Sequence, residues 1–226
     1  GIDDVWLNAL PFHHIGGSCA VVLGALGVGG SFVVLERYDR DQLIRLMPLV
    51  SATRMGGVPT MWHDILASPI LSDTVQLKSV SLGGASVSVE LARAIFDRLG
   101  ARAGIGYGQS EFPIISATLP DDPVEIACDT VGKTLPHIEL KIVDPKTGAT
   151  LRCGEVGEIW LRGPICMDGY WENPKATGET IDSDGFLFLR GRADGAIMRG
   201  GFKILPETIE RALLQHEAVA EAAVVD

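Results

Sequence analysis

The chain has 226 residues, of which 46% are hydrophobic and 21% charged, and its formal net charge at pH 7 is −10. A chain of this size can bury on the order of 70% of its unfolded surface, so a stable hydrophobic core is expected. The negative charge, with no cluster of Lys and Arg, argues against partners such as nucleic acid or an anionic membrane, because both need clustered cations. No apolar run reaches the roughly 18 residues of a spanning helix, so no transmembrane segment is predicted.

The first half of the chain alternates short apolar runs with segments of helical period, which predicts βαβ units around a parallel sheet. The predicted strands are residues 5–10, 31–35, 53–58, 79–82 and 102–105. One helix is predicted at 39–49, and another follows the capping residue Ser88. Gly100 is suited to end that second helix, because glycine readily adopts the left-handed conformation found at helix C-termini.

After about residue 120 the pattern changes to strands joined by turns, which are predicted at residues 139–143, 158–162 and 186–190. A turn at Gly200-Gly201 then precedes a predicted helix at 206–215 and a strand at 222–225. We therefore expect three units. They are an αβ unit at residues 1–118, a β-rich unit at 119–192 and the beginning of a small α+β unit at 193–226.

The cysteines and the first residues of the chain bear on its cellular location and on whether it is part of a longer protein. Cys19, Cys128, Cys153 and Cys166 are scattered without Cys-x-x-Cys spacing, so buried free thiols in a reducing, cytoplasmic location are expected. The acidic start lacks the basic residues of a signal peptide. Because residue 1 is not Met and directly precedes a predicted strand, we expect the chain to be a piece of a longer protein. The tryptophans at 62, 160 and 171 are expected to pack in the core or between units.

Two glycine-containing segments are the candidates for a ligand-binding site. Residues 106–111 read Gly-Tyr-Gly-Gln-Ser-Glu, and Gly83-Gly84-Ala85 lies one helix upstream. Both follow predicted strands at their carboxyl ends, where open α/β sheets bind ligands. A glycine-flanked aromatic ring followed by a hydroxyl and a carboxylate can stack a base, bond a phosphate and hold a magnesium ion. The two segments predict a nucleotide site, and the alternative is an ordinary glycine-rich strand exit beside a tight turn.

Residues 106–111 also resemble the Tyr-Gly-x-Thr/Ser-Glu motif of the adenylate-forming superfamily, which includes acyl-CoA synthetases, luciferases and peptide-synthetase adenylation domains. Further stretches match in the family's order, at residues 10–17, 82–85, 154–159, 169–174 with Ala176-Thr177, 191–194 and 200–206. The resemblance implies an α/β fold class. Parallel βαβ layers of the adenylation domain would be followed by a β-rich subdomain and the start of a small α+β C-terminal subdomain.

The resemblance also implies roles for individual residues. Tyr107 would stack on adenine, Ser110 would bond a phosphate and Glu111 would coordinate Mg²⁺. The rest of the nucleotide site would be formed by Gly83, Gly84, Ala85, Gly106, Gly108, Gln109 and the ribose-contacting Arg192. Asp194 would be the hinge of the C-terminal subdomain, and Gly200 and Gly201 would lie beside the CoA tunnel. His14 would border the acyl carboxylate, with a structural histidine as the alternative.

The activity implied is that of an AMP-forming acid–CoA ligase, acting on ATP, coenzyme A and a carboxylic acid that we expect to be fatty or aromatic. The alternatives are a peptide-synthetase adenylation domain and a catalytically incomplete nucleotide-binding fragment, and a homo-oligomer is left open. Between Thr180 and Asp184 the family's ribose-binding Thr-Gly-Asp segment is missing. One explanation is that Asp182 or Asp184 replaces its aspartate, and the alternative is that the full-length protein has the segment and these residues lack it. The family's phosphate loop and C-terminal lysine fall outside these residues.

Overall fold

The computed structural model describes residues 1–119, 121–189, 197–199 and 202–204, together with residues 209, 213 and 219. The strand predicted at 222–225 lies outside these residues, as does the helix predicted at 206–215 except for positions 209 and 213.

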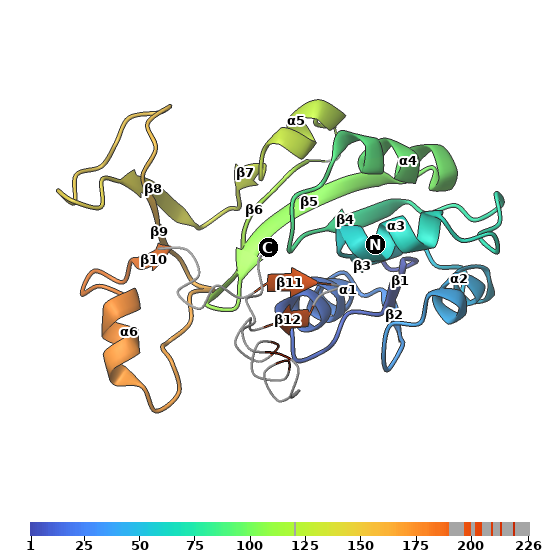
Figure 1. The fold of residues 1–226 in the computed structure, drawn as a ribbon, viewed down its shortest axis with the longest axis horizontal. Coiled ribbons are helices and arrows are strands. Elements are labelled where there is room, and N and C mark those ends of the chain that lie inside the picture. The colour runs from blue at the N-terminus through green and yellow to red at the C-terminus, as the bar shows by residue number, and fades with distance from the viewer. Residues whose placement is uncertain are drawn as a thin grey trace.

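A seven-stranded sheet forms the larger part of the molecule (Figure 1). Its strands are β1 (Val5–Asn8), β2 (Ser31–Val34), β3 (Arg54–Gly57), β4 (Ser79–Leu82), β5 (Arg102–Gln109), β6 (Phe112–Ala117) and β7 (Lys133–Thr134). They lie in the order β2-β1-β3-β4-β5-β6-β7, with parallel pairing from β2 to β5 and antiparallel pairing from β5 to β7. The predicted α/β class with a largely parallel sheet is confirmed.

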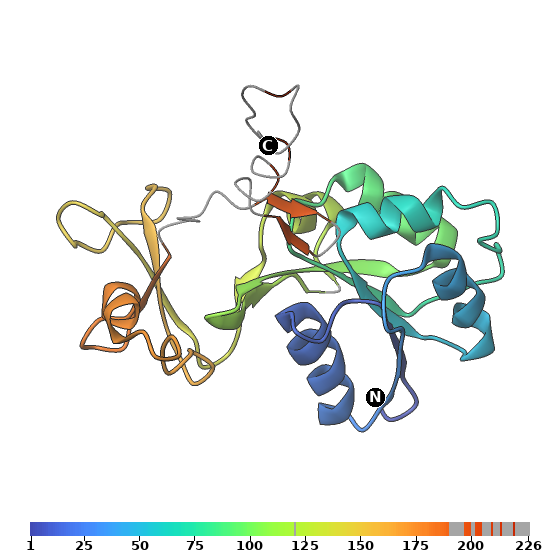
Figure 2. The ribbon, with the colours of Figure 1, turned by 60° about the horizontal axis from the view of Figure 1, so that its bottom comes forward.

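Helices cover both faces of this sheet. They are the π-helical η1 (Gly16–Leu23) with α1 (Gly24–Gly27), then α2 (Arg40–Leu49), α3 (Pro59–Leu66), α4 (Val89–Leu99) and α5 (Val124–Asp129). Because the chain steps from β1 outward to β2 and then back past β1 to β3, right-handed crossovers place η1 and α1 on the face opposite α2, α3 and α4. Figure 2 shows α3 and α4 on one side of the sheet and η1 with α1 on the other.

The helix ends follow the sequence signals. Asp39 accepts a hydrogen bond from the backbone N–H of Gln42 at the start of α2, and Ser88 accepts one from Leu91 at the start of α4. Gly100 ends α4 with a φ of 66°, in the left-handed region that favours glycine. The predictions of both helices are therefore confirmed.

No helix was predicted where η1 and α1 lie, because this stretch contains several glycines and glycine disfavours the interior of a helix. One of them has a packing role instead. A Cβ on Gly17 would lie 2.4 Å from the carbonyl oxygen of Pro11, so only glycine lets the helix start against the loop that follows β1.

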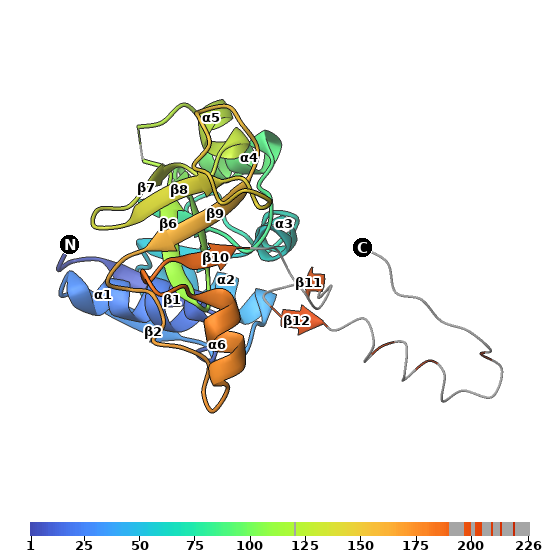
Figure 3. The same ribbon diagram turned by 90° about the vertical axis from the view of Figure 1, so that its left-hand side faces the viewer.

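A second, three-stranded antiparallel sheet has the order β10-β9-β8 (Figure 3), and α6 (Pro174–Thr180) lies in the connection before β10. Its strands are β8 (Glu139–Val143), β9 (Glu158–Arg162) and β10 (Leu187–Leu189), close to the predicted ranges. A short antiparallel pair, β11 (Ile197–Arg199) and β12 (Phe202–Ile204), follows. The exact boundaries of the three predicted units stay a prediction.

A small hydrophobic cluster joins the two larger sheets. It consists of Phe112 and Ile115 from β6, Leu161 from β9 and Leu187 from β10, all essentially inaccessible to solvent. The main core is separate and lies between the seven-stranded sheet and its helices. We call the small group the joint cluster, because it fixes the end of the β5–β6 hairpin against the second sheet.

A buried ion-pair network lies at the amino ends of β1, β3 and β4. Asp4 is 2% exposed, and its carboxylate accepts hydrogen bonds from Arg54 Nε at 2.8 Å, Lys78 Nζ at 2.7 Å and Thr53 Oγ1 at 3.2 Å. Chiefly through the Lys78 hydrogen bond, and further through Arg54, this setting holds the pKa of Asp4 far below its usual range.

Two expectations about burial are wrong. The four cysteines are free, as predicted, but Cys153 is exposed and the other three are only half-buried. Trp62 is fully buried and Trp160 packs against Phe186 and Phe188, whereas Trp171 is 89% exposed. Cys153 and Trp171 both lie in turns, where no periodic pattern directs a side chain inward. In the part of the chain that the structure describes, no helix has both the length and the apolar character needed to cross a membrane.

Candidate active site

The structure brings the two glycine segments together. The parallel register pairs Leu82 of β4 with Ile105 of β5, so the residues that follow them lie side by side. A Cβ on Gly83 would lie 3.0 Å from the carbonyl oxygen of Gly106, and Gly84 has a φ of 78°. Gly83 thus packs directly against the backbone of β5, and Gly84 and Ala85 are exposed beside it. They lie at the carboxyl end of β4, the edge at which open α/β sheets bind ligands.

The motif at residues 106–111 does not follow its strand, which corrects the sequence prediction. β5 continues to Gln109, and Ser110 and Glu111 form the turn that leads into β6. The reason is the antiparallel pairing with β6, which extends β5 four residues beyond the predicted end. Ser110 is exposed and Glu111 is half-buried at the tip of this hairpin.

Gly108 interrupts the hairpin. The pairing register shifts between Tyr107 and Gln109, so Gly108 lies at an irregularity of the kind that re-aims neighbouring side chains. A Cβ there would lie 2.2 Å from the carbonyl oxygen of Pro113, so a larger residue cannot be accommodated without moving the backbone of β6. The geometry of the Ser110–Glu111 turn thus depends on a glycine two residues upstream.

Tyr107 contributes to packing as well as to the candidate site. Its ring is half-buried and packs against the joint cluster. Burial raises the pKa of its hydroxyl, so the phenol is protonated at neutral pH. A ring held in this way keeps a fixed orientation, which is what a stacking partner for a base requires.

Glu111 is held from the second sheet's side by a residue that the sequence analysis did not assign. The hydroxyl of Tyr170 donates a hydrogen bond to Oε1 of Glu111 at 2.7 Å, and the backbone N–H of Met167 donates one to the Glu111 carbonyl at 2.9 Å. The signal was in the sequence, because Tyr170 belongs to one of the stretches that resemble the family. Spacing alone could not show that it reaches a residue 59 positions away.

His14 precedes η1 and is half-buried. Its Nδ1 accepts a hydrogen bond from the backbone N–H of Gly16 at 3.0 Å, a local contact that fixes the ring. Burial, with a smaller contribution from His13, lowers the pKa of His14, so the ring is neutral at pH 7. His14 can therefore be either a structural histidine or a residue that borders the acyl carboxylate, because a ring fixed through Nδ1 can still present Nε2 to a ligand.

The donor set fits a magnesium ion that is bound together with nucleotide phosphates. Mg²⁺ in such sites takes one or two carboxylates and completes its shell with substrate phosphates and water. Glu111 supplies one carboxylate at an accessible hairpin tip. Among the residues that the structure describes, no three His, Cys, Asp or Glu gather into an all-protein cation site.

The two proposed substitutes for the missing ribose-binding aspartate differ. Oδ1 of Asp182 accepts hydrogen bonds from the backbone N–H groups of Asp184 at 2.9 Å and Phe186 at 2.8 Å, so this carboxylate stabilises its own turn. Asp184 is exposed, and the contact that it makes to Arg162 uses its backbone carbonyl. The Asp184 carboxylate is therefore the better placed of the two for a ligand.

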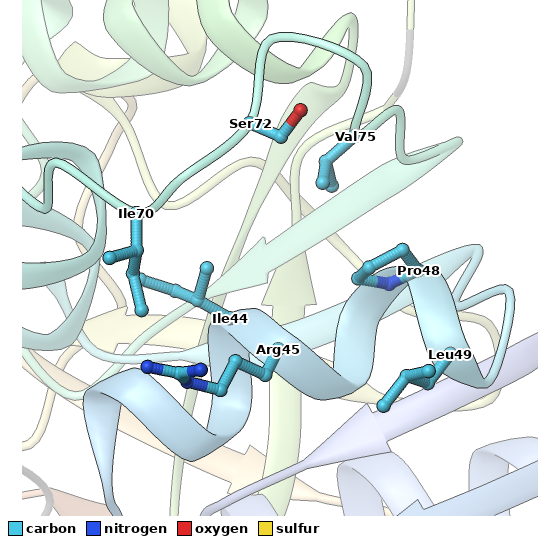
Figure 4. Close-up of a pocket in the computed structure, with 7 residues that line it drawn as sticks. All are labelled: Ile44, Arg45, Pro48, Leu49, Ile70, Ser72 and Val75. Atoms are coloured by element: carbon cyan, nitrogen blue, oxygen red, sulfur yellow. The ribbon is translucent and has the colours of Figure 1, made fainter.

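The remaining predicted site residues, Arg192, Asp194, Gly200 and Gly201, lie outside the described residues. An open cavity of about 410 Å³ lies elsewhere, between α2 and the segment that leads into β4 (Figure 4). Its walls are mostly apolar, with Ile44, Pro48 and Leu49 from α2 and Ile70 and Val75 opposite. None of the predicted site residues lines this cavity.

Comparison with known proteins places the chain in a family. A family model described as AMP-binding enzyme matches residues 1–171. The 4-coumarate–CoA ligase 1 of Solanum tuberosum is 32% identical, over 99% of this chain and 45% of that ligase. The aligned region has 243 positions, more than the 226 residues of this chain, so that ligase carries residues that are missing here.

Solved structures agree. A malonyl-CoA ligase, in a ternary product complex with methylmalonyl-CoA and AMP, has 33% identity and a TM-score of 0.77 over 99% of this chain and 52% of its own. The amide bond synthetase of Marinactinospora thermotolerans has 31% identity and a TM-score of 0.78 over 100% of this chain and 48% of its own. The chain thus spans about half the length of these proteins. Since the family model includes both glycine segments and the hairpin between β5 and β6, the chain belongs to the AMP-binding enzymes, the adenylate-forming superfamily.

Proposed function

We propose that this chain is part of an ATP-dependent acid–CoA ligase. The observation that carries the proposal is the close approach of Gly83 to Gly106, at the base of the hairpin whose turn carries Ser110 and Glu111. The reaction has two steps. The substrate carboxylate attacks the α-phosphorus of ATP and displaces pyrophosphate, and the thiol of CoA then attacks the acyl-adenylate carbonyl and displaces AMP.

In this proposal the described residues bind and orient the nucleotide. The turn at Gly83, Gly84 and Ala85, with Gly106 beside it, has no side chain larger than a methyl group and receives adenine, and the ring of Tyr107 stacks on it. Ser110 bonds a phosphate, and Glu111 holds Mg²⁺, which neutralises phosphate charge when bound. Gly108 and Gln109 fix the course of the hairpin between these contacts.

Further roles are proposed for residues around this centre. His14, neutral and fixed through Nδ1, borders the acid's carboxylate. Arg192 contacts the ribose, Asp194 is the hinge of the C-terminal subdomain, and Gly200 and Gly201 lie beside the path of CoA. The units proposed are the αβ part at 1–118, the β-rich part at 119–192 and the start of the C-terminal subdomain at 193–226.

The acid is proposed to be a fatty or aromatic monocarboxylate, and the name of the 4-coumarate–CoA ligase relative supports the aromatic choice. A second candidate has the same first step with an amine as the acceptor. It is supported by the likeness to the amide bond synthetase. The two functions differ only in what attacks the acyl-adenylate.

A two-stage assay tests the proposal. The full-length gene product is incubated with ATP, Mg²⁺ and a panel of aliphatic and aromatic acids, and pyrophosphate release is measured for each. With the active acid, CoA or simple amines are then added and the product is identified by mass spectrometry. A thioester supports the ligase and an amide supports the second candidate, whereas no acid-dependent release from any acid would contradict both.

A further inference from the structure

The residues from Gly169 to Asn173 belong to a stretch of family resemblance to which the proposed function gives no role. The structure shows that this stretch reaches the candidate site. Its Tyr170 donates a hydrogen bond to Oε1 of Glu111 at 2.7 Å. Within the part of the chain that the structure describes, no other side chain is hydrogen-bonded to this carboxylate.

The place of Tyr170 is fixed by its own turn. Its backbone N–H donates to Oγ1 of Thr177 at 2.9 Å, and that hydroxyl donates to the Asn173 carbonyl at 3.0 Å. Gly169 has a φ of 149°, and a Cβ there would lie 2.8 Å from Cγ2 of Thr177. Asn173 in turn caps α6 by accepting from the N–H of Ala176 at 3.1 Å. These contacts hold the backbone of Tyr170 in place, and its side chain, 37% exposed, reaches the hairpin through its hydroxyl.

The loop that carries Tyr170 is also attached to the hairpin through the backbone. The N–H of Met167 donates to the Glu111 carbonyl at 2.9 Å, and the Met167 side chain packs against the joint cluster. The two contacts hold Glu111 at its main chain and at its side chain. A free glutamate side chain at an accessible tip samples several rotamers, and fixing it in one before a ligand arrives removes that entropic cost from binding.

We propose that Tyr170 is a positioning residue for Glu111, holding Oε1 through its hydroxyl so that Oε2 is presented to the magnesium ion of the bound nucleotide. The inference rests on the proposed function, because it assigns the cation to Glu111. It explains why the stretch around Tyr170 combines a tyrosine with a glycine, an asparagine and a threonine. These residues build the turn from which the hydroxyl reaches the carboxylate.

The chain offers a matched control. Tyr38 donates a hydrogen bond to Oδ2 of Asp64 at 2.9 Å, another tyrosine–carboxylate pair, at a position far from the hairpin in the sequence. Tyr170→Phe and Tyr38→Phe each delete one hydroxyl from such a pair. If Tyr170 acts only as a structural link, both variants should change the melting temperature and neither should change cation binding.

The experiment measures Mn²⁺, a paramagnetic substitute for Mg²⁺, by electron paramagnetic resonance in the presence of ATP and the full-length protein. For Tyr170→Phe we expect about tenfold weaker Mn²⁺ binding, the effect of losing one hydrogen bond to a charged group. The Mg²⁺ concentration for half-maximal pyrophosphate release should rise by the same factor, and Tyr38→Phe should match the wild type. Unchanged Mn²⁺ affinity in Tyr170→Phe would overturn the inference.

A second pair of variants covers the case in which Tyr170→Phe does not fold. Thr177→Val removes the acceptor for the Tyr170 N–H and should weaken Mn²⁺ binding in the same direction, whereas Thr177→Ser keeps the hydroxyl and should restore it. The two proposals fail separately. Pyrophosphate release with unchanged Mn²⁺ affinity in the variants refutes the role of Tyr170 alone. If no acid supports release, the ligase proposal fails and the Mn²⁺ titrations still decide the positioning claim.

Discussion

The buried carboxylate of Asp4 gives the sharpest prediction for stability. Asp4→Asn keeps the size of the side chain but removes the charge that Arg54 and Lys78 contact. Removing one partner from a buried ion pair costs about 3 to 5 kcal/mol. Since Arg54 is 33% and Lys78 56% exposed, both cations can regain water, and we expect a loss near the lower end, about 3 kcal/mol.

The assay is urea unfolding of the wild type and the variant at pH 7, with Asp73→Asn as the control. Asp73 pairs with Arg98 but is 83% exposed, so its loss should cost less than about 1 kcal/mol. The pH dependence has a definite sign. Because the folded pKa of Asp4 is lowered from 3.8, its contribution is complete above that value and is lost as the pH falls below it. A loss of under 1 kcal/mol at pH 7, or one that does not shrink in acid, would refute the reasoning.

Three further predictions concern the hairpin, the joint cluster and the thiols. Gly108→Ala should displace β6, because its Cβ would meet the Pro113 carbonyl at 2.2 Å, and we expect at least a tenfold loss of pyrophosphate release, where full activity would contradict the account. Phe112→Ala empties a fully buried position and should cost about 3 to 5 kcal/mol in urea unfolding, and a cost under 1 kcal/mol would argue against the joint cluster. A thiol reagent should modify exposed Cys153 first, because burial raises the pKa of Cys128 and Cys166, and peptide mapping that finds either of those first would contradict this order.

Local signals predicted much of the fold. Alternation of strands and helical periods indicated the parallel sheet, and Ser88 and Gly100 marked the ends of α4, because capping is a property of a few adjacent residues. The extension of β5 was not predictable in the same way. Its last residues are strand because β6 returns to pair with them, and that pairing depends on the Gly108 irregularity and the turn at Ser110.

In the candidate site, too, features set by adjacent residues were predictable and a contact between distant residues was not. The composition of residues 106–111 indicated a nucleotide site, and the strand register places Gly83 against Gly106. The contact between Tyr170 and Glu111 depends instead on how the second sheet packs on the hairpin through the joint cluster. No periodicity connects residues that lie so far apart in the chain, so only the structure could reveal this contact.

The most direct test of the central claim is acid-dependent exchange of labelled pyrophosphate into ATP by the full-length protein. The exchange reports acyl-adenylate formation alone and is independent of whether CoA or an amine accepts the acyl group. We expect exchange that requires both an acid and Mg²⁺. It should be lost in Glu111→Ala with the fold intact and kept in Glu179→Ala, which removes an exposed carboxylate from α6. Undiminished exchange in Glu111→Ala, or no exchange with any acid, would contradict the account.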